Sequence, residues 1–364
     1  MIPPPSAFSR PPLNGLLARI AAESSVTQTR LQTLGQQISS GSIADTFAGL
    51  DQNARTTLML RPVMAAMATW QSNITAANAR VDITLTAMDR ITAIASDFYA
   101  RVNNLNGLNI TNVDITAAAA RDALRELTGL LNTTDGDIYV FGGQDTGNPP
   151  VPNGDAILSS GFYTQIAASV AALGGAGASA TIAATLAIGG SNAPGTSPFS
   201  AYLSQSPAAL QGLRPSVEVA DLRRQSFGIQ ASINTTAVSI GTSTTGSYSR
   251  DLLRALSTIG SLSSSQIGDA GFAALVEDTR TGLRDAITAM ATDAGIIGND
   301  RMRLSAIQDQ SEHYLLSITA QVAATEDVDM PAALASLSQV QAQLQASYQM
   351  IGSLRELTLV RYLS

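Results

Sequence analysis

The feature that most constrains the fold of this chain is the spacing of apolar residues near its N-terminus. From Leu13 to about Ser40 they recur in a strict 4-3 pattern, which is the a/d seam of a coiled-coil helix. Gly41 follows as a helix stop. Two layers of the seam are polar, so the helix is not expected to be stable alone. The seam positions are Leu13, Leu17, Ile20, Ser24, Thr27, Leu31, Leu34 and Ile38.

A second seam lies at the C-terminus. Asp329 precedes Met330-Pro331, and an acidic cap followed by an early proline suits the first turn of a helix. The helix is expected to run nearly to the last residue, and at ~1.5 Å per residue each terminal helix is about 40–50 Å long. The seam follows 3-4 spacing at Leu337, Val340, Leu344, Ser347, Ile351 and Leu354.

Neither terminal seam has a neighbour in the sequence that would cover it. The simplest solution is that the chain folds back and its two ends pair in a long antiparallel coiled coil or helical bundle. Two thin stripes rich in Ser, Thr, Gln and Ala are marginal as an isolated pair, so we expect copies of the same chain to complete the burial. An ordinary intramolecular bundle core is the alternative. The expected assembly interface consists of Leu13, Leu17, Ile20, Leu31, Leu34, Ile38, Leu337, Val340, Leu344, Ile351 and Leu354.

Further helical patterns flank the middle of the chain. A long pattern covers 53–103, with Pro62 as a kink site, and a shorter one runs from Ile115 to Asn132. After the middle, a helix is expected to begin at Tyr248, and a long one follows over about 271–324.

The middle of the chain has a different composition. Residues 138–247 hold 15 of the 29 glycines and 7 of the 14 prolines, and no charged residue occurs over 156–213. Short β-branched runs near Ile138, at Thr181-Ile182, at Ser216 to Val219 and at Ser232 to Ile240 predict strands between loops. The expected fold class is therefore mainly α with a β-rich insertion.

Five domains follow from these patterns. The two ends are inner-core helices, the flanking segments form a helical core, and the middle is a β-rich insertion that faces solvent. The expected ranges are 1–45 for the N-terminal inner-core helix, 46–135 and 248–328 for the two parts of the helical core, 136–247 for the insertion, and 329–364 for the C-terminal inner-core helix.

The composition excludes several classes of function. The chain has no cysteine and one histidine, which excludes a disulfide framework, a cysteine-ligated metal centre and a His-rich metal site. A net charge of −7 without basic clusters argues against nucleic-acid binding. The first twelve residues include five prolines and no apolar run, so they do not form a secretory signal peptide. Residues 165–190 are uncharged but too rich in Ala, Ser, Thr and Gly for a membrane span.

Several residues are candidates for catalysis or metal binding, and each has a simpler interpretation. His313 lacks nameable partners for acid–base work, and the loop 142–147 lacks the lysine of a phosphate-binding loop. Asp135, Asp137 and Asp145 do not follow a calcium-loop pattern. An enzyme housed in the insertion would find no acid, base or cation in the uncharged run. We therefore expect no enzymatic activity, no catalytic residue, no metal and no cofactor.

The order of several local motifs resembles the bacterial flagellin superfamily, and within it the hook-associated protein 3 family of the hook–filament junction. The resemblance covers about residues 13–145 and 250–363 and leaves the middle unmatched. After Ser40-Gly41 the chain lacks the Asp-rich loop that is usual in flagellins. The motifs that carry the resemblance lie at 332–348, 357–363, 135–143 followed by Pro149-Pro150-Val151, 73–91, and Gly298 with Arg303-Leu304.

The resemblance implies a structural subunit of the bacterial flagellum that joins hook to filament. It implies self-assembly into a ring, contact with flagellin and a neighbouring hook-associated protein, and an export chaperone, with neither nucleic-acid binding nor membrane insertion. Its expected location is extracellular, after type III export without a cleaved signal peptide. A filament flagellin is the alternative, and a type III secretion needle-tip or translocator protein is a more distant one.

Overall fold

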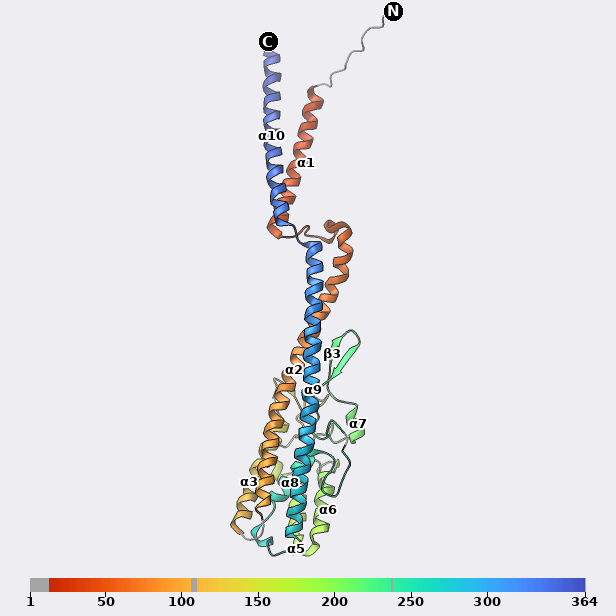
Figure 1. The fold of residues 1–364 in the computed structure, drawn as a ribbon, viewed down its shortest axis with the longest axis vertical. Helices are drawn as coiled ribbons and strands as arrows, with labels where there is room; N and C mark the ends of the chain where they lie inside the picture. Colours follow the sequence, from red (N-terminus) through yellow and green to blue (C-terminus); the bar gives the residue numbers. More distant parts are fainter. Residues whose placement is uncertain (1–12, 106–109, 237, 364) are drawn as a thin grey trace, which may run out of the picture. The chain divides into compact units, whose positions relative to one another are not determined.

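The computed structural model describes residues 13–105, 110–236 and 238–363, and this part of the chain is mainly α-helical (Figure 1). The chain forms two compact units, which we call the terminal unit (1–67 and 313–364) and the central unit (68–312). The helices and strands are α1 (Leu13–Ser40), η1 (Phe47–Asn53), α2 (Ala54–Asn103), α3 (Ile110–Leu131), β1 (Thr134–Asp135), β2 (Ile138–Tyr139), η2 (Ile157–Ser159), α4 (Gly161–Ala171), α5 (Leu173–Ala176), α6 (Ala178–Gly189), α7 (Pro207–Gln211), β3 (Ser216–Ala220), β4 (Arg223–Ser226), α8 (Tyr248–Gly260), η3 (Ser264–Gln266), α9 (Phe272–Glu326) and α10 (Met330–Leu363).

The terminal helices have the bounds that their spacing predicts. Helix α1 ends before Gly41, which takes a positive φ of 74° that suits glycine. Helix α10 begins after Asp329, whose carboxylate accepts a hydrogen bond from the Ala332 N–H at 3.0 Å. The expected caps of both helices are therefore confirmed.

Helices α2 and α9 contribute to both units, and α2 continues through Pro62. Within the central unit the two helices run antiparallel, because Asp82 pairs with Arg301 at 2.7 Å while Asn103 accepts a bond from Arg280 at 3.2 Å. Every third or fourth residue of α2 in this unit is buried, including Ile74. The core of the central unit is therefore lined along its length by these two helices.

Helix α8 lies at the centre of the central unit, and all thirteen of its residues are buried. It packs against α3, α4 and α6. Ser247 caps its start by accepting a bond from the Arg250 N–H. The predicted start at Tyr248 is confirmed. A helix covered on every side buries its polar residues as well, so each of them needs a partner inside the protein.

The expected β-rich insertion is wrong, because most regular structure between 136 and 247 is helical. The strand expected at Thr181-Ile182 lies inside α6. The described residues of the one expected over Ser232 to Ile240 are irregular apart from one bridge, at Ile233. The physical reason is the alanine content, which favours helix, combined with four-residue spacing of buried side chains. Those buried side chains are Phe162, Ile166 and Val170 on α4, and Thr181, Thr185 and Gly189 on α6.

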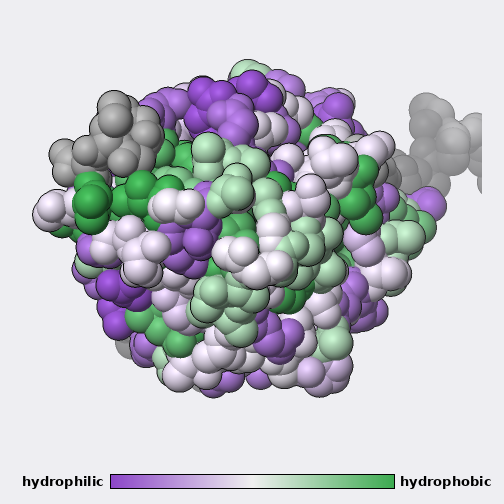
Figure 2. Space-filling model, turned by 90° about the horizontal axis from the view of Figure 1, so that it is seen from below, coloured by the Kyte–Doolittle hydropathy of each residue, from purple (hydrophilic) through white to green (hydrophobic). Residues whose placement is uncertain are grey.

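Two small antiparallel hairpins are the sheets of the described residues. Strands β1 and β2 pair Thr134 with Tyr139, and β3 and β4 pair Ser216 with Ser226. The predicted strand at Ser216 is confirmed as β3. The uncharged run that was considered for a membrane span folds as the short helices α4, α5 and α6, and none of the described helices is long and apolar enough to cross a membrane. Figure 2 shows one end of the central unit, where hydrophilic and hydrophobic residues are mixed over the visible face.

Candidate assembly interface

The seam of α1 follows the predicted spacing in the structure. Ile20, Leu31, Leu34 and Ile38 are half-buried, while most of the positions between them are exposed. Ser24 is the most deeply buried seam residue, and its hydroxyl has no hydrogen-bond partner among the described residues. The polar layer predicted from the sequence therefore lies inside the seam.

The seam of α10 is similar. Val340 is buried, and Leu337, Leu344 and Ile351 are half-buried. The side chains of three further predicted positions, Leu13, Leu17 and Leu354, lie outside the described residues.

Helices α1 and α10 lie side by side (Figure 1) and run antiparallel. The Val328 N–H donates to the Gly41 carbonyl at 2.9 Å, near the loop that joins each helix to the rest of the unit. Farther along, the Gln28 amide donates to the Tyr348 hydroxyl at 3.4 Å. The described parts of the two terminal helices therefore pair with each other. Most seam leucines and isoleucines keep part of their surface exposed in the single chain.

Large apolar side chains are also exposed elsewhere in the terminal unit. Most of the exposed large apolar residues described in the chain belong to this unit, although it is the smaller of the two. The terminal unit therefore exposes more large apolar side chains than the central unit does. These residues are Val26, Phe47, Leu58, Met59, Val63, Tyr314, Leu316, Met330, Leu334, Tyr348 and Met350.

A bidentate ion pair joins the start of α2 to the end of α9 within the terminal unit. Arg61 donates to both carboxylate oxygens of Glu326, at 3.1 and 2.6 Å. This hydrogen bonding lowers the pKa of the Glu326 carboxyl. Next to it, the hydroxyls of Thr57 and Thr325 lie 3.3 Å apart. These contacts fix the base from which α1 and α10 extend.

The two buried arginines of α8, Arg250 and Arg254, have structural partners inside the central unit. Arg254 pairs with Asp278 at 3.0 Å, and the Arg254 side chain is 2% exposed. Arg250 donates to the backbone carbonyls of Gly189 and Ser191, and burial lowers the pKa of its guanidinium to about 10. Arg250 therefore binds the end of α6, and Arg254 binds α9 and the loop before α8.

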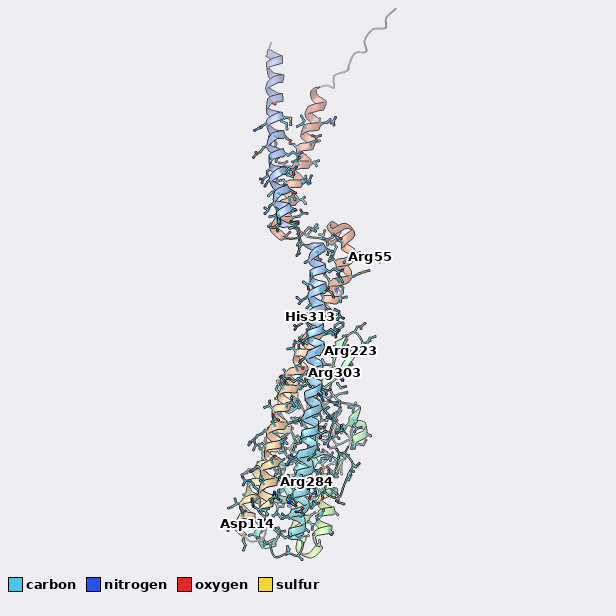
Figure 3. The ribbon with its side chains drawn as sticks, in the orientation of Figure 1. Arg55, Asp114, Arg223, Arg284, Arg303 and His313 are labelled. Carbon is cyan, nitrogen blue, oxygen red and sulfur yellow. The ribbon has the colours of Figure 1, made fainter. Side chains whose placement is uncertain are left out.

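The residues that were candidates for catalysis lie apart or have structural partners in the described part of the chain. His313 lies exposed on α9 (Figure 3). Burial raises the pKa of the Asp293 carboxyl. Its two oxygens both accept from the single N–H of Thr235, so this carboxyl holds the loop that contains Thr235 in place. Among the described residues, no three His, Asp or Glu side chains are close enough to hold a metal ion.

The comparison with family models gives one finding. Residues 281–363 match the bacterial flagellin C-terminal helical region. The match supports the bacterial flagellin superfamily, and it covers α10 and most of α9. A comparison with curated proteins returned no match. The flagellin match therefore falls on the helix that carries the α10 seam and on the long helix that leads into it.

Proposed function

We propose that this chain is a structural subunit of the bacterial flagellum that joins hook to filament and assembles through its terminal helices. The observation that carries the proposal is the half-buried α1–α10 seam, whose C-terminal half lies in the region matched by the flagellin family model. The subunit would be exported through the flagellar type III apparatus with a chaperone. It would form a ring outside the cell, in contact with flagellin and a neighbouring hook-associated protein.

In the proposed mechanism, copies of the chain associate because each covers apolar seam surface that its neighbour leaves exposed. Fully burying a leucine or isoleucine side chain is worth about 1.5–3 kcal/mol relative to exposure. A half-buried one, most of whose surface is already covered, retains at most about 1 kcal/mol that a neighbouring copy can supply. Ile20, Leu31, Leu34 and Leu337 are among the positions in this state. Several such positions on each chain together would add a few kcal/mol to assembly.

The segment after α3 supports the junction role over the filament role. In the sequence, Asp135 to Gly143 resembles the corresponding segment of junction proteins. In the structure this segment holds the β1–β2 hairpin, and Phe141 after it is buried, with its carbonyl accepting a bond from the Ala231 N–H at 2.9 Å. A filament flagellin is the second candidate, because the matched model describes flagellins in general.

Localisation on intact flagella tests the two candidates. Antibody against this chain, seen by immuno-electron microscopy, should mark the filament base in a few copies. A deletion strain should lose attached filaments. Label along the whole filament would instead identify a filament flagellin, and a deletion strain that still grew full, attached filaments would overturn both.

Paired substitutions test the seam. Leu31→Asp places a charge in the half-buried stripe, whereas Gln32→Asp places the same charge on the exposed face of the same helix. We expect Leu31→Asp to abolish assembly and Gln32→Asp to preserve it, with the unfolding of the central unit unchanged in both. Equal assembly by the two variants would contradict the proposed role of the seam.

A further inference from the structure

A hollow of about 600 Å³ lies on the central unit between α2 and the β3–β4 hairpin, which is labelled β3 in Figure 1. The loop after β2 forms its third side. All of the residues that line it are among those that the structure describes. A volume of this size is typical of small-molecule sites in proteins. The chemistry of the lining therefore indicates which ligand the hollow suits.

The lining of this hollow contains two arginines and no carboxylate. Arg224 of β4 donates through Nε and Nη2 to Ser216 on the paired strand, at 3.1 and 3.3 Å, and its Nη1 has no partner among the described residues. The Nε of Arg80, on α2, lies 3.5 Å from the Asp135 carboxylate, and the two terminal nitrogens of Arg80 have no described partner. Glu218 is the cross-strand neighbour of Arg224, but it lies outside the lining and no ion pair joins these two described residues. Asp135 offsets part of the charge of Arg80, so the hollow keeps a net positive charge.

Three neutral polar side chains in the lining are also without a hydrogen-bond partner in the described part of the chain. Asn73 comes from α2, and Gln144 and Thr146 come from the loop after β2. Amide and hydroxyl side chains can together donate and accept hydrogen bonds, and the hydroxyl groups of a sugar do the same. Pro215 and Val217 add apolar surface to the lining. These groups therefore suit a ligand that carries several hydroxyl groups.

We propose that this hollow binds an anionic sugar, whose charged group is bound by Arg80 and Arg224. Guanidinium groups pair with both carboxylates and phosphates through charge-assisted hydrogen bonds, so a sugar with either group has the required chemistry. Asn73, Gln144 and Thr146 bind the ring hydroxyls in this arrangement. The two arginines come from different elements of the fold, which fixes the charged group relative to the amide and hydroxyl side chains.

Two other hollows of the central unit differ from this one in their polar groups. The lining of the hollow beside Phe199 has no charged residue. Arg250 lines another hollow, but its guanidinium already donates to three backbone carbonyls. Arg80 and Arg224 differ from Arg250 because they keep N–H groups available for a ligand.

Binding of defined probes to the full-length, unassembled chain tests the inference by saturation-transfer difference NMR. Glucuronate and glucose 6-phosphate are the probes and distinguish a carboxylate from a phosphate, while glucose, acetate and inorganic phosphate are the controls. We expect at least one anionic sugar to bind about tenfold or more tightly than glucose and than its own free anion. Binding of neither anionic sugar, or equal binding of glucose or of the free anion, overturns the inference. Because the chain is unassembled, the result does not depend on the proposed function.

Two neighbouring arginines of β4 provide a matched pair of variants. Arg224→Gln should weaken binding of the sugar by about tenfold or more. Arg223→Gln removes the same charge from the opposite face of the hairpin, outside the lining, and should bind like the wild type. Both arginines are exposed, so urea unfolding should be unchanged in both variants. Equal affinities of the two variants overturn the inference. Arg224→Gln should still assemble whereas Leu31→Asp should not, which separates this inference from the proposed function.

Discussion

Replacing Asp278 by alanine should destabilise the central unit strongly. The Asp278 carboxylate pairs with Arg254 at 3.0 Å and accepts a bond from the Ser243 hydroxyl at 2.5 Å. The two charged side chains are 2% and 7% exposed, so solvent screens their interaction little. Arg254 also donates to the Ser243 carbonyl at 2.7 Å. The substitution therefore removes the carboxylate that is paired with the buried guanidinium. The neutral Ser243 carbonyl still accepts from Arg254, and the charge of Asp251 acts on it from a greater distance.

The expected loss is about 3–5 kcal/mol, which is the usual cost of removing one partner of a buried ion pair. This is a large part of the roughly 5–15 kcal/mol by which a folded domain is stable. The double variant Arg254→Met, Asp278→Leu removes both charges and should recover much of the loss. The Ser243 carbonyl, left without its donor, sets a remaining cost of about 1–3 kcal/mol.

Urea unfolding followed by circular dichroism measures these free energies, and hydrogen exchange of the α8 amides reports the same change locally. Glu277→Ala is the matched control, because Glu277 precedes Asp278 on α9 and its side chain is 58% exposed. It should change stability by less than about 1 kcal/mol. The reasoning is refuted if Asp278→Ala behaves like the control, or if the double variant is no more stable than Asp278→Ala.

Three further predictions concern packing and pH. Ser24→Ala removes a buried, unpartnered hydroxyl and should raise the stability of the α1–α10 pair by about 1 kcal/mol in thermal unfolding; a lower melting temperature would contradict this. Gly161→Ala should lower the free energy of unfolding by about 1–3 kcal/mol, because the new Cβ would lie 1.9 Å from the Gly195 carbonyl oxygen. Gly147→Ala, whose Cβ would lie in open space, should be tolerated. Equal urea midpoints for the two variants would refute the clash. Burial raises the pKa of the Asp293 carboxyl above its ordinary 3.8, so the native state binds the carboxyl proton more tightly than the unfolded chain does. The stability that this proton contributes is lost as pH rises through the raised pKa. Asp293→Asn should therefore gain stability relative to the wild type across that pH range, and a constant difference between the two would count against it.

Helix bounds could be predicted from the sequence where the faces of a helix differ strongly in hydropathy. The 4-3 seam and Gly41 predicted the bounds of α1, and Asp329 predicted the start of α10. Helix α6 was missed because alanine and threonine occupy all of its faces, which leaves almost no difference in hydropathy between its sides. Its helical form depends on packing against α4 and α8, which spacing in the sequence does not reveal.

The candidate site was predictable to a similar degree. The seam residues of both terminal helices follow from periodicity, and those with described side chains lie in half-buried or buried positions. The positive φ and the 96% exposure of Leu222 could not be predicted in this way, since the tertiary fold sets both. The Arg254–Asp278 pair was also missed, because the two residues lie on different helices and their burial is set by the tertiary fold.

The uncharged segment 156–213 has a consequence for the unfolded chain. Once released from the central unit, this segment has no like charges to keep chains apart, and it remains rich in apolar residues. Before release, the folded state protects the segment from aggregation. After release, only the charges that flank the segment oppose it. Arg250, which binds the carbonyls at the end of α6, is among the contacts that must break before the segment is freed. These two hydrogen bonds therefore help to prevent aggregation by keeping the segment in the folded central unit.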